Sequence, residues 1–214
     1  MKKLSLSLII PTFNEKENFS NIKKNITLLN SKEVLIVDGN SSDKSFSTFS
    51  SLRKKIILSS PSRGVQLHLG AKSAQENWLL FMHADTLLSK KNIKDIRKFI
   101  KKKNYNKVAY FKLRFDSTKI TAFIITYWAY IRTVLFKLPF GDQCLLINKS
   151  YYQKIGGFSP IPVMEDMEFI LKVPRKNKFL FKSSVQTSFR KYQKNGILKQ
   201  CCKNIINQIN FLIK

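Results

Sequence analysis

Short apolar runs alternate with segments of helical periodicity along the first half of the chain. The runs predict buried strands at residues 4–10, 34–37, 56–58 and 78–82. The segments between them predict helices at residues 15–29, after a cap at Ser42 or Asp43, and at residues 64–77. This alternation predicts a Rossmann-like α/β fold, with a mostly parallel sheet and helices on both of its faces.

The pattern changes after about residue 105. We expect a longer strand at residues 107–115, an apolar and aromatic segment at 120–136, and a loop followed by a strand at 140–148. A helix, a Gly156-Gly157 turn and a helix near Glu165 follow. From about Arg190, an amphipathic C-terminal helix is indicated by apolar residues at helical spacing, namely Leu198, Cys201 or Cys202, Ile205, Ile209 and Leu212. No repeat or linker interrupts the chain, so we expect a single domain of residues 1–214 in two halves that meet near residues 105–106.

Composition fits a globular domain, but the charge is unusual. The chain has 39 Lys and Arg against 13 Asp and Glu, which gives a net charge of +26. Such a charge attracts nucleic acid, anionic lipid or phosphorylated substrates. A bias towards AT-rich codons would also raise the lysine content, and the sequence does not separate these two causes. The three cysteines form no CxxC motif, which fits a reducing cytosol. The longest apolar segment, residues 120–136, is interrupted by Arg132 and is short for a membrane span.

In so basic a chain the positions of the acids are informative. Glu15, Asp38 and Asp85 each follow a different predicted parallel strand. The carboxyl ends of such strands form the ligand crevice, so these acids should converge there. Converging acids suit either a divalent cation or a hydrogen-bonded base and ribose, and Mg²⁺ typically takes one or two carboxylates and completes its shell with water and phosphate oxygens. The alternative is that acids after strands cap helices. It is the stronger interpretation for Asp43 and the weaker one for Asp85, because Ser89 is the better cap.

A basic residue lies at the start of the third predicted helix. Arg63 precedes Gly64 there, where a guanidinium and a helix N-terminus can together bind a phosphate. Neither a Walker A loop nor a G-x-G-x-x-G motif is present, so the common ATP and dinucleotide fingerprints are absent.

Seven segments occur in a family-like order over roughly residues 4–172: IIPTFNE, VDGNSSD, SRGVQLHLGAKSA, LLFMHADT, LPFGDQCLLINKSYY, IGGF and MEDMEF. Together they resemble the family 2 glycosyltransferases, which have the GT-A fold. The most similar branch is a small bacterial one associated with radical-SAM and arsenosugar or selenosugar genes. The resemblance implies a nucleotide-binding half at residues 1 to about 105, followed by an acceptor-side half with the C-terminal helix.

The resemblance also assigns residues to the donor. It implies that the nucleotide sugar is bound by Pro11, Thr12, Asn14, Glu15, Asp38, Arg63, Gln66, His83 and Ala84. Within that set, Asp38 corresponds to the acid that holds the base or ribose, and Arg63 and Gln66 approach the nucleotide and diphosphate. His83-Ala84-Asp85 stands at the D-x-D position, with Asp85 as the metal ligand and His83 in place of the first Asp.

On the acceptor side, the resemblance implies that Glu165-Asp166 is the family's E-D motif. Asp166 is then the catalytic base, with Glu165 beside it, whereas an acidic first helical turn is the purely structural alternative. Asp142 and Gln143 match a motif near the acceptor.

The implied enzyme is an inverting, hexosyl-type transferase that uses Mn²⁺ or Mg²⁺. It would move a sugar from a UDP- or GDP-linked donor to an acceptor hydroxyl or carboxyl. Residues 120–136, the amphipathic helix and the charge suggest a lipid-like acceptor and peripheral contact with the anionic inner face of the cell membrane. Two alternatives remain: a nucleotidyltransferase of the same fold class, and a basic protein that binds nucleic acid or an anionic surface. No nucleic-acid module is recognisable, so specific nucleic-acid binding is not expected.

Overall fold

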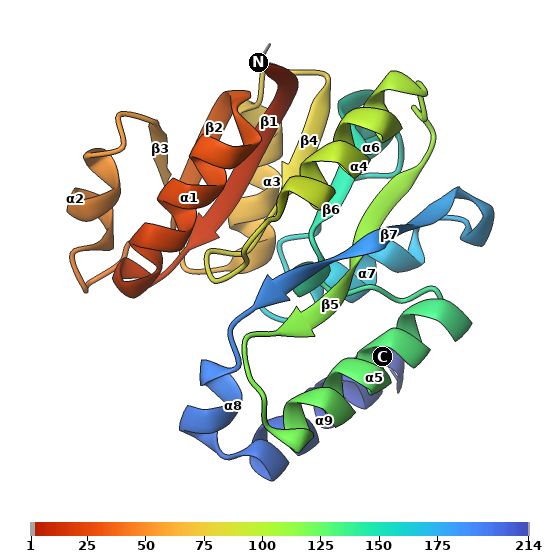
Figure 1. Ribbon diagram of the computed structural model, residues 1–214. Coiled ribbons are helices and arrows are strands. Elements are labelled where there is room, and N and C mark those ends of the chain that lie inside the picture. Colours follow the sequence, from red (N-terminus) through yellow and green to blue (C-terminus); the bar gives the residue numbers. More distant parts are fainter. Residues whose placement is uncertain (1–2, 214) are drawn as a thin grey trace.

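The computed structural model describes residues 3–213, which are organised around one seven-stranded sheet of order β3-β2-β1-β4-β6-β5-β7 (Figure 1). The strands are β1 (Leu4–Thr12), β2 (Ser31–Asp38), β3 (Lys55–Leu58), β4 (Trp78–Phe81), β5 (Val108–Phe115), β6 (Leu145–Asn148) and β7 (Lys178–Thr187). Neighbouring strands among β1 to β4 are parallel, and so are β5 and β7. Only β6 runs antiparallel to its neighbours β4 and β5. The expected mostly parallel α/β sheet is confirmed.

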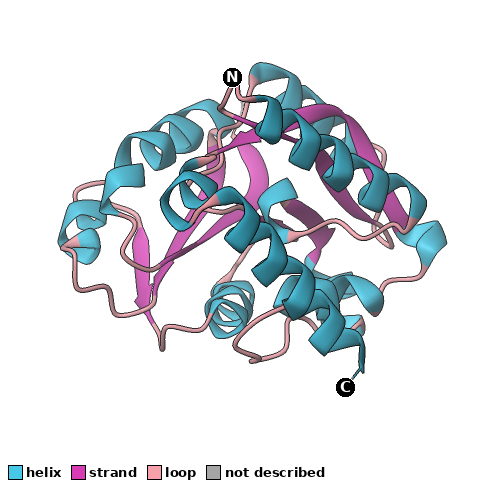
Figure 2. Ribbon diagram, turned by 90° about the horizontal axis from the view of Figure 1, so that it is seen from below, coloured by secondary structure: helices cyan, strands magenta, loops and turns pink. Residues whose placement is uncertain are grey.

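Helices cover both faces of the sheet, as the apolar runs required (Figure 2). One face packs against α1 (Phe19–Leu29), α2 (Ser45–Ser50) and α4 (Lys90–Lys101). The other packs against α3 (Arg63–Ser73), α6 (Lys149–Lys154) and α7 (Glu165–Leu171). Three short 3₁₀ helices join the elements: η1 (Lys16–Asn18), η2 (Gly141–Gln143) and η3 (Arg175–Asn177).

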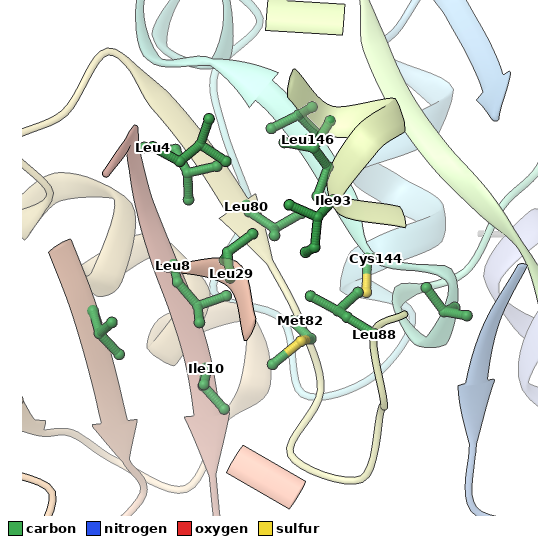
Figure 3. Packing of buried hydrophobic residues seen from close by; sticks show 14 of the residues in the cluster. Leu4, Leu8, Ile10, Leu29, Leu80, Met82, Leu88, Ile93, Cys144 and Leu146 are labelled. Atoms are coloured by element: carbon green, nitrogen blue, oxygen red, sulfur yellow. The ribbon is translucent and has the colours of Figure 1, made fainter. Parts of the chain in front are cut away.

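The central strands are buried on both faces. Along β1, Leu4, Leu8 and Ile10 point into the cluster drawn in Figure 3, whereas Ile9 belongs to the cluster on the opposite face. A strand covered on both faces needs apolar residues at successive positions, and this explains the continuous run in the sequence. Burying each such Leu or Ile contributes about 1.5–3 kcal/mol.

A third, smaller cluster lies beyond the ends of β5 and β7. It contains side chains of β5, of α5 (Ile120–Leu135) and of the segment leading into α8 (Arg190–Asn195), namely Leu113, Phe115, Ala122, Ala129 and Phe189. Ile197, the first residue of α9 (Ile197–Ile213), packs against it. This cluster attaches α5, α8 and α9 to the lower end of the sheet in Figure 1.

The C-terminal helix differs from the expected one in two ways. Gly196, with φ +80°, separates α8 from α9, so the segment is two helices. The apolar positions Leu198, Ile205 and Ile209 are exposed, whereas Gln200 is buried. The side chain of Leu212 lies outside the described residues. The expected amphipathic stripe therefore faces outwards.

The bounds of other helices differ from the expected ones by a few residues, and strand β7 was not predicted. The helix expected at residues 64–77 ends at Ser73, and α1 begins only after the 3₁₀ turn η1. Strand β7 lies at the edge of the sheet, where exposed Phe179 and Lys182 alternate irregularly with buried Phe181 and Val185. Such an edge lacks a clean period of two. Within residues 3–213, no helix is both long and apolar enough to cross a bilayer.

Candidate active site

Sheet topology brings together two acidic loops that are distant in sequence. Phe81 at the end of β4 pairs with Leu145 at the start of antiparallel β6. The residues after β4 therefore lie beside the residues before β6, which form η2. The approach is close: a Cβ added to Gly141 would lie 2.6 Å from the Nε2 of His83. If β6 ran parallel to β4, the loop after β4, with Asp85, and the loop before β6, with Asp142, would lie at opposite ends of the two strands.

Asp166 joins this group through two backbone hydrogen bonds. Its Oδ2 accepts from the N–H of Gly141 at 2.8 Å, and its Oδ1 accepts from the N–H of Met167 at 2.7 Å. The residue lies in the first turn of α7 and is 9% exposed. Backbone groups of two different elements therefore fix the carboxylate beside η2, while each oxygen keeps a second lone pair for a substrate proton.

Glu165 pairs with Arg63 on the opposite side of the site. The Nη1 of Arg63 lies 3.3 Å from the Oε1 of Glu165, whose side chain is buried while that of Arg63 is partly exposed. Burial raises the pKa of Glu165, and the charge of Arg63 opposes this rise. Gly64 makes the pair possible, because a Cβ there would lie 2.3 Å from the carbonyl oxygen of Ser159. Arg63, expected at the diphosphate, thus lies beside Glu165 of the proposed E-D motif.

The loop that carries Asp85 is held from two sides. Asn25 of α1 donates through Nδ2 to the carbonyl of Thr86 at 2.6 Å and accepts from the N–H of Leu88 at 2.9 Å. Leu87 pairs with Gln186 of β7. Burial raises the pKa of Asp85 to about 6, and the nearby charge of Glu15 raises it further. Burial also raises the pKa of Glu15. Both shifts come mainly from the shielding of these carboxylates from water.

Two buried polar atoms in the same region lack a hydrogen-bond partner among residues 3–213: Oδ1 of Asp142 and Nε2 of His83. Burial raises the pKa of Asp142 to about 6, Arg132 opposes the rise, and the charges of Asp166 and Asp85 add to it. Burial and the charge of Arg63 hold the pKa of His83 well below its usual range, so its imidazole is neutral at pH 7. Buried polar atoms are normally satisfied, so these exceptions add to the reasons for treating this region as a candidate site.

The predicted nucleotide residues form a connected group at the ends of β1 and β2. The carboxylate of Asp38 accepts from Oγ1 of Thr12 at 2.9 Å and from the backbone and hydroxyl of Ser41, both at 2.8 Å. Gln66 donates to the carbonyls of Thr12 and Val37 at 2.8 and 2.7 Å. These contacts hold the two strand ends in register, so Asp38 and Gln66 have structural roles whatever they bind.

The remaining donor-side residues lie around this group. Pro11 is buried in β1 and Ala84 is buried after β4. Asn14 adopts a left-handed backbone with φ 54°, and its Oδ1 accepts from the N–H of Ser42 at 2.9 Å. Glu15 follows directly, with its N–H bonded to Oγ of Ser45 at 2.9 Å. Glu15 and Asp85 are close enough for their charges to interact, whereas Asp38 contacts Thr12 and Ser41 at the end of β2.

Gln143 is used inside the protein. Its Nε2 donates to the carbonyl of Phe111 at 2.7 Å, and its Oε1 accepts from Oγ1 of Thr133 at 3.1 Å and from the N–H of Phe140 at 3.1 Å. These bonds position η2, whereas a contact between Gln143 and the acceptor stays a prediction.

Sequence reasoning did not assign Arg132 or Lys191 to this site. The guanidinium of Arg132 lies 3.3 Å from the ring centroid of Phe140, and the charges of Asp142 and Asp166 act on its pKa. Burial and the charge of Arg63 lower the pKa of Lys191, and Asp85 and Asp142 oppose this. A signal existed for Arg132, which is the single charged residue in the apolar segment 120–136.

The side chains of the site suit a cation that is held partly by the protein and partly by the substrate. Among the described residues, no group of three or more His, Cys, Asp or Glu side chains is placed to hold a metal ion. A cation held by one carboxylate, water and diphosphate oxygens needs no such group. Asp85, with its raised pKa and the negative charge of Glu15 nearby, fits that arrangement.

Comparison with known proteins agrees with this geometry. The model of the family "Glycosyl transferase family 2" matches residues 7–148, which include most of β1, all of β2 to β6 and the two loops that carry Asp85 and Asp142. No curated protein sequence matches the chain significantly.

Solved structures of similar fold include residues 1–349 of S. aureus TarS, with a TM-score of 0.66 and 16% identity over 86% of this chain and 60% of that one. The mannosyltransferase PcManGT from Pyrobaculum calidifontis, in complex with GDP-Man and Mn²⁺, has a TM-score of 0.66 and 14% identity over 87% of this chain and 57% of that one. Glucosyl-3-phosphoglycerate synthase from Mycobacterium tuberculosis has a TM-score of 0.61 and 10% identity over 86% of this chain and 70% of that one.

At these identities the likeness is one of fold, and the chain spans about 60% of the length of the first two structures. The expected GT-A architecture is confirmed. Because the family model covers most of the chain, it favours the glycosyltransferase over the nucleotidyltransferase. The chain belongs to glycosyl transferase family 2.

Proposed function

We propose that the protein transfers a sugar from a nucleoside diphosphate sugar to an acceptor hydroxyl or carboxyl, with inversion and with the help of a divalent cation. One observation carries this proposal. Asp85, Arg63 and Asp166 come from three separate elements, and mutual charge effects and hydrogen bonds place them around one small region in a family 2 fold.

The donor would bind across the carboxyl ends of β1, β2 and β4. Residues 1 to about 105 would hold the nucleotide, and the rest of the single domain would face the acceptor. Arg63 is the natural partner for the diphosphate, because its side chain is partly exposed and its charge reaches Glu15, His83 and Asp85. A UDP- or GDP-linked donor is proposed, and the GDP-Man complex of the archaeal neighbour supports a nucleotide sugar in this fold.

Asp85 would hold the cation, Mn²⁺ or Mg²⁺. When bound, the cation would supply positive charge that stabilises the leaving diphosphate. The neighbour with bound Mn²⁺ supports a divalent cation. We keep His83 among the proposed donor residues: it is neutral, and its buried Nε2 lacks a partner within residues 3–213.

Asp166 would be the base for a hydroxyl acceptor. It takes the proton of the hydroxyl while the hydroxyl oxygen forms a bond to the anomeric carbon. The bond from that carbon to the diphosphate oxygen breaks, and its electron pair leaves with the diphosphate. Inversion needs a single base, and Glu165 is occupied by Arg63. Glu165 therefore orients the guanidinium, and Asp166 performs the proton transfer.

The acceptor side is the less defined half of the proposal. Asp142, with its unpartnered buried oxygen, is the side chain placed to meet an acceptor beside Asp166. We include in the proposal a lipid-like acceptor, a cytoplasmic location with peripheral contact to the inner membrane face, and membership of the small bacterial radical-SAM-associated branch. The net charge of +26 supports the membrane contact, whereas specific nucleic-acid binding is not proposed.

A thermal-shift panel tests the donor and the cation together. Wild-type protein is heated with UDP- and GDP-linked sugars, each with Mn²⁺, Mg²⁺ or a chelator. We expect one nucleotide sugar to raise the melting temperature only with a cation, because a ligand that binds the folded state stabilises it. Asp85→Ala should lose the cation-dependent part of the shift. Glu76→Ala removes a surface acid that is near Lys32 and should keep it.

Two outcomes would contradict the proposal. If no nucleotide sugar stabilises the protein under any condition, the donor assignment is wrong. If a donor binds equally well in chelator, the cation assignment is wrong. Release of pyrophosphate instead of a nucleoside diphosphate would restore the nucleotidyltransferase.

A further inference from the structure

The large apolar side chains exposed by the described residues are concentrated on two helices. On α5 they occur every three or four residues and form one stripe, consisting of Ile120, Phe123, Ile124, Tyr127, Trp128 and Leu135. The opposite side of α5 is buried at Ala122, Ala129, Arg132 and Thr133. Soluble monomers rarely expose so large a contiguous apolar patch, so this stripe is suited to being covered by something else.

Helix α9 continues the same character at the same end of the molecule. It exposes Leu198, Ile205, Ile206, Ile209 and Ile213. Its first residue packs on the small cluster that also contains Ala122 and Ala129 of α5. Figure 1 places both helices below β5, at the end opposite α2. The two stripes together are called the α5–α9 surface below.

Basic residues predominate around the α5–α9 surface, where exposed Asp116 is the acid nearest to α5 in the sequence. No Asp or Glu occurs between Asp116 and Asp142, or after Glu168. Lys119 and Lys137 flank α5, while Lys199 and Lys203 lie on α9. A second copy of this chain would bring the same positive charge to the contact, whereas an anionic surface would neutralise it. Exposed Tyr127 and Trp128 are side chains typical of the interface between lipid and water.

A groove between α5 and β5 combines both properties. It has a volume of about 550 Å³ and is lined by Leu113, Phe115, Phe123, Tyr127 and Tyr130, together with Lys112 and Arg114. The ammonium of Lys112 lies 5.4 Å from the ring centroid of Tyr130. An apolar groove with two cations suits a molecule that has an apolar chain and an anionic head, such as an acidic phospholipid.

The buried side of α5 reaches the candidate active site. Thr133 bonds to the amide of Gln143, and Arg132 stacks on Phe140. Phe140 and Gln143 lie on either side of Gly141 in the chain, and the N–H of Gly141 donates to the carboxylate of Asp166. One helix therefore presents an apolar stripe to the outside and supports the loop of the proposed base on the inside.

We propose that the α5–α9 surface lies in the interfacial region of an anionic lipid bilayer, with Trp128 among the inserted side chains. The purpose of this contact rests on the proposed function, because the contact would bring a membrane amphiphile to Asp166. Its physical basis is independent of that function. Apolar burial supplies the attachment, and the surrounding lysines add a salt-sensitive attraction to acidic headgroups.

The two tryptophans make the contact measurable. Trp78 is 4% exposed in the core, whereas Trp128 is 57% exposed. The protein is mixed with vesicles of phosphatidylcholine alone, or of phosphatidylcholine and phosphatidylglycerol in equal parts. We expect flotation with the mixed vesicles at low salt, a shift of the emission to shorter wavelength, and quenching by brominated acyl chains. In Trp128→Phe the shift and the quenching should disappear, because only Trp78 still emits.

A pair of substitutions separates the surface from general stickiness. Trp128→Ser should weaken binding to mixed vesicles about tenfold, because a buried apolar side chain of this size contributes more than a factor of ten. Phe46→Ser removes an exposed aromatic from α2 and should bind as wild type does. Both variants should retain the wild-type thermal shift with nucleotide sugar, since neither residue lies in the proposed site.

Several results would overturn the inference. They are an absence of flotation at low salt, an unshifted Trp128 emission on bound vesicles, or equal binding by Trp128→Ser. Sedimentation that shows a dimer in wild type and a monomer in Trp128→Ser would assign the surface to self-association instead. A protein that responds to nucleotide sugar but ignores vesicles refutes the inference alone. A protein that floats but responds to no nucleotide sugar refutes the proposed function alone.

Discussion

Gly141→Ala is a small change that acts directly on the proposed catalytic loop. Its new Cβ would lie 2.6 Å from the Nε2 of His83 and 3.5 Å from the Oδ2 of Asp166. Ordinary contacts begin near 3.4 Å, so the loop or the imidazole must move by roughly 0.8 Å to relieve the overlap. His83 is held at the end of β4, and Gly141 donates the hydrogen bond that positions Asp166, so part of that movement passes to the carboxylate.

A displacement of about 1 Å in a reacting group can lower turnover by about a hundredfold. We therefore expect kcat to fall by about 10- to 100-fold in Gly141→Ala, with a loss of stability of about 1–3 kcal/mol from overpacking. Donor affinity should change less than kcat, because Gly141 lies on the acceptor side and His83 is the one proposed donor residue that its new Cβ meets. The assay is nucleoside diphosphate release, with thermal-shift measurements of donor binding alongside.

A control isolates the steric effect from a general loss of stability. Gly156→Ala introduces a Cβ with no atom within 4 Å, but at φ +85°, so it should lose about 1 kcal/mol of stability and no activity. Adding His83→Ala to Gly141→Ala should restore part of the stability. Wild-type turnover in a folded Gly141→Ala protein would show that the arrangement of Gly141, His83 and Asp166 does not control the reaction.

Three further predictions concern stability and the Asp85 loop. Because Asp142 has a folded pKa of about 6 against 3.8 unfolded, its ionisation lowers stability as pH rises between these values. In chelator, the free energy of unfolding of Asp142→Asn should exceed that of wild type by up to about 3 kcal/mol at pH 8 and differ little from it at pH 3. A difference that does not depend on pH in denaturant titrations would refute this. Gly64→Ala should cost more stability than Gly156→Ala, since its Cβ meets a backbone oxygen at 2.3 Å, and equal melting temperatures would contradict that. Asn25→Ala should remove the partners of the Thr86 carbonyl and the Leu88 N–H and so weaken cation-dependent donor binding. An unchanged donor dissociation constant would count against the role of Asn25 in holding the Asp85 loop.

The parallel half of the fold was predictable because local patterns determine it. Residues 34–37 and 78–82 are apolar and buried throughout, and residues 4–10 are apolar except at Ser5 and Ser7. Residues 56–58 belong to the edge strand β3, which is only partly buried. The edge strand β7 was missed because burial acts on only some of its positions. The exposure of the apolar face of α9 was not predictable either. Helical spacing locates an apolar stripe but does not say whether the rest of the protein or something else covers it.

The site was predictable where residues follow strands and unpredictable where it depends on an antiparallel pairing. Asp38 and Asp85 follow β2 and β4 directly, so their convergence follows from a parallel sheet. Asp142 and Asp166 were expected at the site by resemblance alone, and the approach of the Asp142 loop to His83 at Gly141 follows from β6 running against β4. Arg132 reaches the site from α5, which follows β5 in the chain, and no local pattern contains this relation.

The central claim is that Asp166 accepts a proton from the acceptor during sugar transfer. Asp166→Asn tests it most directly, because the amide keeps the size of the side chain and removes its basicity. With the nucleotide sugar that stabilises the wild-type protein, and with membrane extract as the source of acceptor, nucleoside diphosphate release should fall by about 10² to 10⁴. The donor-induced thermal shift should stay at its wild-type value, and Glu165→Gln should be affected less. Near-normal release by a folded Asp166→Asn protein would contradict the account and would make Asp142 the leading candidate for the base.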